Sequence, residues 1–206
     1  MARLAKQRAE NEIEFSRLVA FSDGVFAIAI TLLVLNLRVP GHLGNDELSS
    51  ALWDQWPDVL AFALSFAVIG RFWVIHHRFF GEVTGFDARL IALNLFYLAW
   101  IVLLPFSSQV LGDYGGDEAA VILYSINLSA VVLAGTLMFS DAQRSGLVRT
   151  TPEEARENRN RALRIAAVFL ISIPVALVNP PLAQWFWLAL FAGPATSRIA
   201  GRRRAG

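Results

Sequence analysis

The stretch RLVAFSDGVFAIAITLLVLNL, residues 17–37, decides how the chain is expected to fold. Its polar entry, which contains Arg17, Ser22 and Asp23, leads directly into an apolar run over residues 25–35. Together they are about as long as the roughly 20-residue helix that crosses the hydrocarbon core of a bilayer. The stretch therefore predicts a transmembrane helix that carries a carboxylate near its entrance.

The composition of the chain predicts further membrane helices. Of its 206 residues 55% are hydrophobic and only 17% are charged, and the mean hydropathy is +0.49. A soluble domain of this size needs more polar surface than this, and several other apolar runs also approach 20 residues. The absence of cysteine excludes disulfides, thiolate catalysis and zinc–thiolate sites. We therefore expect an all-α membrane protein.

Proline, glycine and charged residues divide the chain into separate spans. The fifth span is preceded by TTPEE, which is typical of a helix start with Thr151 as the N-cap and Pro152 in the first turn. The pattern predicts a single six-helix transmembrane domain over residues 1–206. The expected spans cover residues 18–37, 58–80, 89–111, 119–139, 162–178 and 182–199.

Basic residues are distributed asymmetrically between the connections. Sixteen of the eighteen Lys and Arg residues fall in the N-terminal segment, the second and fourth connections or the C-terminal segment, whereas the first and third connections are acidic. Basic connections stay in the cytoplasm, so both termini are predicted to be cytoplasmic and the number of spans even. An arginine-rich C-terminus is also typical of nucleic-acid-binding tails, but beside membrane spans we interpret it as a topology anchor and expect no nucleic-acid partner.

Asp23 and the polar residues around it form the first candidate site. Ser22 and Asp23 would cap a helix that begins there, but Arg17 lies more than a turn earlier and places both inside the helix. An intramembrane carboxylate needs a cation or a hydrogen-bond donor, and Arg17, Arg71 and His77 are the candidates. From these residues alone, a structural network and a direct role in ion passage both stay open.

The second span carries two adjacent histidines. Trp73 and His77 are four residues apart and share a helix face, whereas His76 and His77 point in different directions. Since only His42 remains elsewhere, we expect no metal site. A buried His77 that hydrogen-bonds a neighbouring helix is preferred over a proton relay.

The apolar half of the first helix is the second candidate site. Ile28, Leu32 and Leu35 recur at i, i+4 and i+7 and form one stripe about 10 Å long, with Thr31 beside it. Contact with lipid or with the protein core would explain such a stripe. If several copies of the helix met on an axis, however, the stripe would form hydrophobic rings, which can gate ions by dewetting. The chain contains no TVGYG-type carbonyl filter sequence.

Three motifs support the second interpretation. They are RxxxFSDGVFAIxITL at residues 17–32, FWxxHHRF at residues 72–79 and NLxxLxxIxLLPF at residues 94–106. Together they resemble the bacterial relatives of transmembrane protein 175, the endosomal and lysosomal potassium channel. The resemblance implies a six-helix subunit in the bacterial inner membrane that assembles as a homotetramer, in which the first helices line a central pore permeable to K⁺.

The resemblance also implies roles for particular residues. Ile28 would form the narrow hydrophobic constriction, and Thr31, Leu32 and Leu35 would line the pore towards the external side. A polar network would tie the first helix to its neighbours, with Asp23 as a structural brace; its members would be Arg17, Ser22, Asp23, Trp73 and His77.

The sequence leaves one alternative function and excludes another. The alternative is a proton-coupled secondary transporter in which Asp23 and His77 titrate. An enzyme is not expected, because the chain lacks a nucleophile motif, a phosphate-binding loop and enough metal ligands. We expect no cofactor, and K⁺ enters only as the permeant ion.

Overall fold

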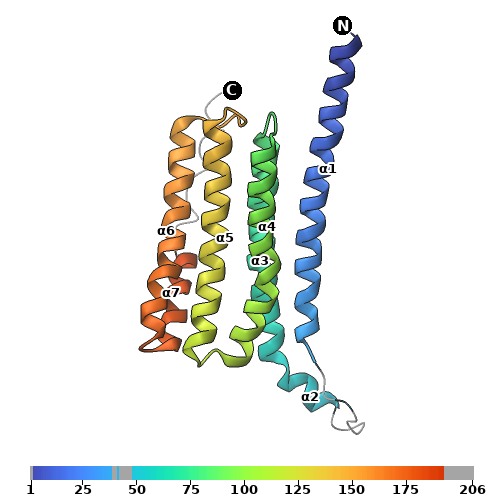
Figure 1. The fold of residues 1–206 in the computed structure, drawn as a ribbon. Coiled ribbons are helices and arrows are strands. Elements are labelled where there is room, and N and C mark those ends of the chain that lie inside the picture. The colour runs from blue at the N-terminus through green and yellow to red at the C-terminus, as the bar shows by residue number, and fades with distance from the viewer. Residues whose placement is uncertain (1, 39–40, 42–47, 193–206) are drawn as a thin grey trace, which may run out of the picture.

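The computed structural model describes residues 2–38, 41 and 48–192, and every regular element within these ranges is a helix. Four helical segments are long and apolar enough to cross a membrane: Glu10–Asn36, Trp56–Glu82, Ala88–Tyr114 and Glu118–Arg144. Figure 1 shows the long helices standing side by side in a bundle. The expected all-helical membrane class is confirmed.

The first helix is longer than the sequence predicts. α1 (Ala2–Leu32) begins well before the expected start at residue 18, and its N-terminal part projects beyond the other helices (Figure 1). No proline or glycine interrupts the polar residues that precede the span, so the helix continues through them. It ends in the 3₁₀ turn η1 (Leu33–Asn36), after which Leu37 is extended.

The later long helices begin at side-chain caps. The Asp87, Asp117 and Thr151 side chains each accept a backbone N–H from the first turn of the helix that follows, and Thr151 and Glu154 complete a capping box. These caps satisfy N–H groups that a helix start leaves without partners. The remaining helices are α2 (Leu48–Asp54), α3 (Trp56–Glu82), α4 (Ala88–Tyr114), α5 (Glu118–Arg144), α6 (Pro152–Ala176) and α7 (Pro180–Ala192).

Two segments depart from the expected spans. α2 is a short helix within the first connection, where the sequence pattern predicts only a loop. α6 starts ten residues before the expected fifth span at 162, and it is not among the four segments that meet the length and composition of a membrane span. The expected sixth span, 182–199, is described only as far as Ala192, and its remainder lies outside the described residues.

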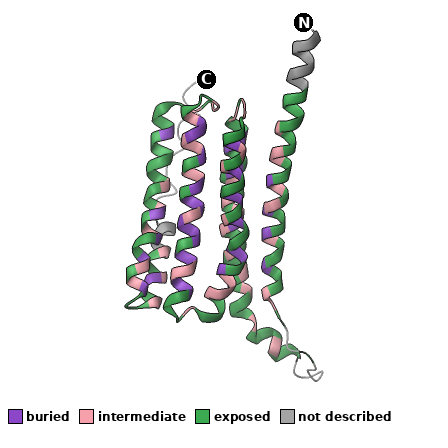
Figure 2. Cartoon of the chain, viewed as in Figure 1, coloured by how far each residue is buried: buried purple, intermediate pink, exposed green. Residues whose placement is uncertain are grey.

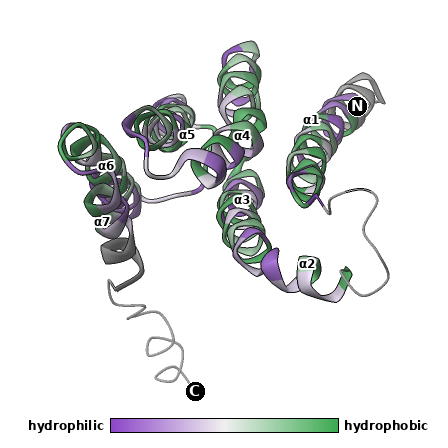
Figure 3. Ribbon diagram, turned by 90° about the horizontal axis from the view of Figure 1, so that it is seen from below, coloured by the Kyte–Doolittle hydropathy of each residue, from purple (hydrophilic) through white to green (hydrophobic). Residues whose placement is uncertain are grey.

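The helices pack mainly on their neighbours in the chain. α1 contacts α3 and α4, α4 contacts α5, and α5 contacts α6 and α7. Figures 1 and 3 place α1 and α6 at opposite edges of the bundle. Buried residues are concentrated on α5 and sparse on α1 (Figure 2). The large side chains at the centre of the core are Phe26, Leu33, Ile69, Ile101, Leu104 and Val131.

The connections α3–α4 and α5–α6 lie at the same end of the bundle, which we call the basic end. Val83 and Val148 form an antiparallel bridge there, and Thr84 donates its backbone N–H to the Leu147 carbonyl at 2.8 Å. Gly146, with φ of 68°, closes α5 in a left-handed conformation that a residue with a side chain rarely adopts. The turn brings the two connections together.

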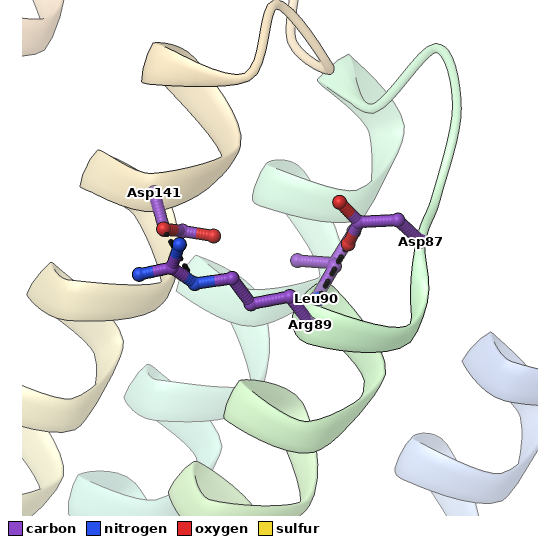
Figure 4. A network of polar contacts seen from close by, with 4 residues as sticks. All are labelled: Asp87, Arg89, Leu90 and Asp141. Carbon is purple, nitrogen blue, oxygen red and sulfur yellow. Dashed lines mark hydrogen bonds and ion pairs between the residues drawn. The ribbon is translucent and has the colours of Figure 1, made fainter.

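An ion pair joins α4 to α5 close to these connections. Figure 4 shows Arg89, in the first turn of α4, reaching Asp141 near the end of α5, with Nε 3.0 Å from the carboxylate. The Asp141 side chain is only 9% exposed, so it needs this cation. Asp87 accepts the Leu90 N–H at 2.7 Å in the same turn (Figure 4) and fixes where α4 begins.

Candidate functional site

The transmembrane part of α1 has two different faces. Ser22, Phe26, Ala29 and Leu33 follow helical spacing and are at most 1% exposed, because they pack against α3 and α4. The stripe predicted from the sequence lies on the other side: Ile28 is 60%, Leu32 39% and Leu35 62% exposed in the single chain. The inner face fixes the helix to the rest of its chain and leaves the stripe uncovered.

Thr31 belongs to the uncovered face. Its Oγ1 donates a hydrogen bond to the Ile28 carbonyl at 2.9 Å. This bond uses the hydroxyl proton, so the oxygen lone pairs of Thr31 point away from the helix. The uncovered face therefore carries one hydroxyl group, that of Thr31, among apolar side chains.

A chain of hydrogen bonds lies buried on the inner face. His76 Nε2 is 2.8 Å from Asn94 Oδ1, Asn94 Nδ2 donates to Ser22 Oγ at 2.9 Å, and Ser22 Oγ donates to the Leu18 carbonyl at 3.0 Å. Since the amide of Asn94 donates to Ser22, its oxygen accepts the Nε2 proton of His76. The chain links α3, α4 and α1 in the order His76, Asn94, Ser22. All three side chains are at most 2% exposed.

Asp23 belongs to a second, more exposed contact. The Trp73 indole Nε1 donates to Asp23 Oδ1 at 2.8 Å, and the Trp73 ring stacks on the His77 ring with centroids 5.5 Å apart. The donor that the intramembrane carboxylate needs is thus an uncharged indole. Arg17 and Arg71 form neither a hydrogen bond nor an ion pair with any residue of the described ranges.

The structure corrects the assignment of the buried histidine. His77 was expected to be buried and bonded to a neighbouring helix, but it is exposed in the single chain, and His76 takes that position. The two residues point in different directions on α3, and the face with Ile69, His76 and Phe80 is the one that packs inward. The five residues expected to form one network therefore divide, with Ser22 in one contact, Asp23, Trp73 and His77 in another, and Arg17 in neither.

Sequence reasoning missed two residues of the buried chain. The sequence pattern assigns no role to His76 or Asn94. The signal for both was the position of a neutral polar side chain inside an apolar span, because such a group must find a hydrogen-bond partner in the protein. In the described residues no group of three or more His, Asp or Glu side chains is placed to hold a metal ion.

The fold and the two faces of α1 define a multi-helix membrane protein with an apolar, unpartnered helix face. A family model described as endosomal/lysosomal potassium channel TMEM175 matches residues 17–105, which contain the second half of α1, all of α2 and α3, and most of α4. A potassium channel of Streptomyces collinus is 36% identical over 189 residues, which are 87% of this chain and 92% of the relative.

Two further comparisons agree. A potassium channel of Chamaesiphon minutus is 40% identical over 134 residues, which are 64% of this chain and 66% of the relative. The crystal structure of a lysosomal potassium-selective channel TMEM175 homolog from Chamaesiphon minutus superposes with a TM-score of 0.69 at 30% identity, over 86% of this chain and 94% of that one. The chain belongs to the TMEM175 family, a family of ion channels and not of enzymes.

Proposed function

We propose that the protein is a potassium-permeable cation channel in which α1 of four identical subunits lines a central pore. The observation that carries the proposal is the uncovered stripe of Ile28, Leu32 and Leu35 on a helix whose opposite face is fully packed. The relatives described as potassium channels support K⁺ as the permeant ion. The pore has no carbonyl filter, and Ile28 forms its narrow hydrophobic constriction.

The burial of the individual spans supports the assembly. Only 22% of the most apolar window of α1 and 11% of that of α3 are buried within one chain, whereas 44% and 56% are buried in α4 and α5. α1 and α3 therefore have the most surface left for other subunits. Meeting at an axis, four α1 helices would place Ile28, Leu32 and Leu35 in successive rings, where dewetting opposes ion passage until the rings widen.

Thr31 is the position at which selectivity between K⁺ and Na⁺ is set in this proposal. Its lone pairs would present four hydroxyl oxygens to a partly hydrated cation between the Ile28 and Leu35 rings. The contact of Asp23 with Trp73 gives Asp23 the role of a brace between α1 and α3. In this arrangement Asp23 is not an ion ligand.

The charge distribution supports an orientation with both termini in the cytoplasm, and the bacterial relatives support an inner-membrane location. The basic end carries Arg78, Arg89, Arg144 and Arg149 near its connections, and the opposite end carries Asp54, Asp113, Asp117 and Glu118. Basic residues favour the cytoplasmic side. The proposed six spans would then include α6 and the helix that begins with α7.

Ion flux into liposomes tests the pore. Purified wild type is expected to conduct K⁺ passively, and Ile28→Asn is expected to raise the K⁺ leak several-fold and lower the K⁺ over Na⁺ ratio, because a polar ring keeps the constriction wet. Ile171→Asn is the matched control. Ile171 lies on α6, and its exposed fraction of 55% is similar to the 60% of Ile28. Equal fluxes in all three proteins would refute the constriction.

The same liposomes distinguish the proposed channel from the alternative function, a proton-coupled transporter. A proton-coupled transporter that uses Asp23 and His77 would carry a flux that follows an imposed pH gradient and saturates with substrate. Passive K⁺ flux without a pH gradient, retained in Asp23→Asn, excludes that mechanism. The absence of passive flux in folded wild type would favour it.

A further inference from the structure

Arg161 and Arg164 of α6 lie well below the basic end, as measured along the axis of the bundle. Ser125 of α5 and Ser172 of α6 are hydrogen-bonded at 2.9 Å, which sets the register of these antiparallel helices. Arg164 lies eight residues before Ser172, which places it at the level of Leu133 on α5. Asp141, at the basic end, is another eight residues or about 12 Å further along α5.

The exposed surface of α5 at this depth is apolar. Leu133 and Leu137 of α5 are both exposed at the levels of Arg164 and Arg161. The buried face of α6 includes Ala155, Ala166 and Phe169, so Arg161 and Arg164 point away from α5, and both are exposed. Being three residues apart, they are neighbours on one face of the helix.

Neither of these two guanidinium groups is paired with a carboxylate in the part of the chain that the structure describes. Neither forms a hydrogen bond or an ion pair within the described ranges, and the nearby Glu154 carboxylate is held by Thr151 in the capping box. From residue 158 to the C-terminus the sequence contains seven arginines and no Asp or Glu. A charge at this depth is costly unless an anion or water reaches it.

The apolar length of α6 supplies an independent argument. Beyond Arg164 the helix continues for only twelve residues to Ala176, a length of about 18 Å against the roughly 30 Å of a hydrocarbon core. A short apolar segment is accommodated by local thinning of the bilayer, with headgroups drawn towards the helix. Thinning beside α6 would bring phosphates to the level of its arginines.

We propose that Arg161 and Arg164 bind the phosphate of an anionic phospholipid of the cytoplasmic leaflet, held below the level of the surrounding headgroups. Two guanidinium groups side by side match the oxygens of a phosphodiester. α6 lies at the edge of the bundle opposite α1 (Figure 3), so with α1 at the pore axis this face meets lipid, a placement that rests on the proposed function.

Lipid binding to the purified protein tests this site without any measurement of conduction. Native mass spectrometry in a neutral detergent is expected to show that phosphatidylglycerol stays bound to wild type and that phosphatidylcholine does not. The double variant R161Q/R164Q is expected to lose at least tenfold in apparent affinity for phosphatidylglycerol. R161K/R164K keeps both charges and is expected to lose less, because Lys cannot bind in a bidentate manner.

The control variant removes two positive charges at the basic end, away from Arg161 and Arg164. R144Q/R149Q replaces two exposed arginines next to the α5–α6 connection and is expected to bind phosphatidylglycerol as wild type does. Equal binding by wild type and R161Q/R164Q would overturn the proposal, as would competition by glycerol phosphate at the same concentration as the lipid. A channel that conducts K⁺ without retaining lipid at this pair would refute the lipid site and leave the pore intact.

Discussion

Asn94 is the residue at which the buried polar contacts of α1, α3 and α4 meet. It accepts from His76 and donates to Ser22, and none of these side chains reaches solvent. Removing its amide leaves His76 without a hydrogen-bond partner and Ser22 with only its bond to the Leu18 carbonyl. A buried polar group without a partner costs more than the hydrogen bond itself contributes.

Asn94→Ala is therefore expected to destabilise the protein by about 1–3 kcal/mol, a range that allows for the modest strength of hydrogen bonds between membrane helices. The measurement is the thermal midpoint of the purified protein in detergent. Asn158→Ala, at an exposed position of α6, is the control and should leave the midpoint nearly unchanged. A midpoint for Asn94→Ala equal to that of the control would show that the buried chain contributes nothing to stability.

Two substitutions of Asp23 separate a brace from a titrating group. Asp23→Asn keeps an oxygen that can accept the Trp73 indole N–H, whereas Asp23→Ala removes the acceptor. We expect Asp23→Asn to assemble and conduct like wild type, and Asp23→Ala to reduce the assembled fraction seen by size-exclusion chromatography with light scattering. Equal loss of flux in both variants, with normal assembly, would assign Asp23 a charge-dependent role in transport.

At the scale of the elements, α4 and α5 approach each other closely at Gly135. A Cβ at this position would lie 3.2 Å from the Tyr97 ring, a distance at which the ring has to shift. Gly135→Ala is expected to lower the thermal midpoint relative to Gly112→Ala, where a Cβ has no neighbour within 4 Å. Both positions are helical, so the difference between the two midpoints reports mainly the α4–α5 contact. Identical midpoints would mean that the ring moves at no cost.

The sequence predicts the helices better than their faces. Apolar length and the cap at Thr151 locate long helices, because both signals are local. Which of two adjacent histidines is buried depends on which face of α3 meets α1 and α4, and this is a tertiary property. α1 begins at Ala2 and not at the expected residue 18, because a polar helical segment has no apolar signal to mark it in the sequence.

The candidate site shows the same limit. The stripe from Ile28 to Leu35 follows from spacing, but spacing does not say whether it is packed or free. The burial of Ser22, Phe26 and Leu33 on the opposite face answers that question for the single chain. Whether other subunits cover the stripe is a property of an assembly, and the spacing of residues within one chain carries no signal for it.

At the scale of the whole molecule, the absence of cysteine gives a direct test of the assembly. Single cysteines can be introduced without a background thiol, and a disulfide forms only where two Cα atoms come within about 7 Å of each other. In a pore lined by α1, Leu35 of neighbouring subunits would approach the axis together, whereas α6 would lie at the periphery (Figure 3). Leu35→Cys in membranes treated with a mild oxidant is therefore expected to give a disulfide-linked dimer on non-reducing gels.

Two controls make this outcome specific to the pore. Ile171→Cys is exposed to a similar degree but lies on α6, and it should stay monomeric under the same oxidant. Phe26→Cys lies on the packed face of α1 and should also remain unlinked, because its own subunit covers it. Cross-linking at Ile171 and not at Leu35 would place α6 at the axis, which would remove both the proposed pore and the lipid-facing position of Arg161 and Arg164. Cross-linking at Leu35 alone would show that the α1 stripes of neighbouring subunits lie close together. A conducting path lined by Ile28, Leu32 and Leu35 requires this arrangement.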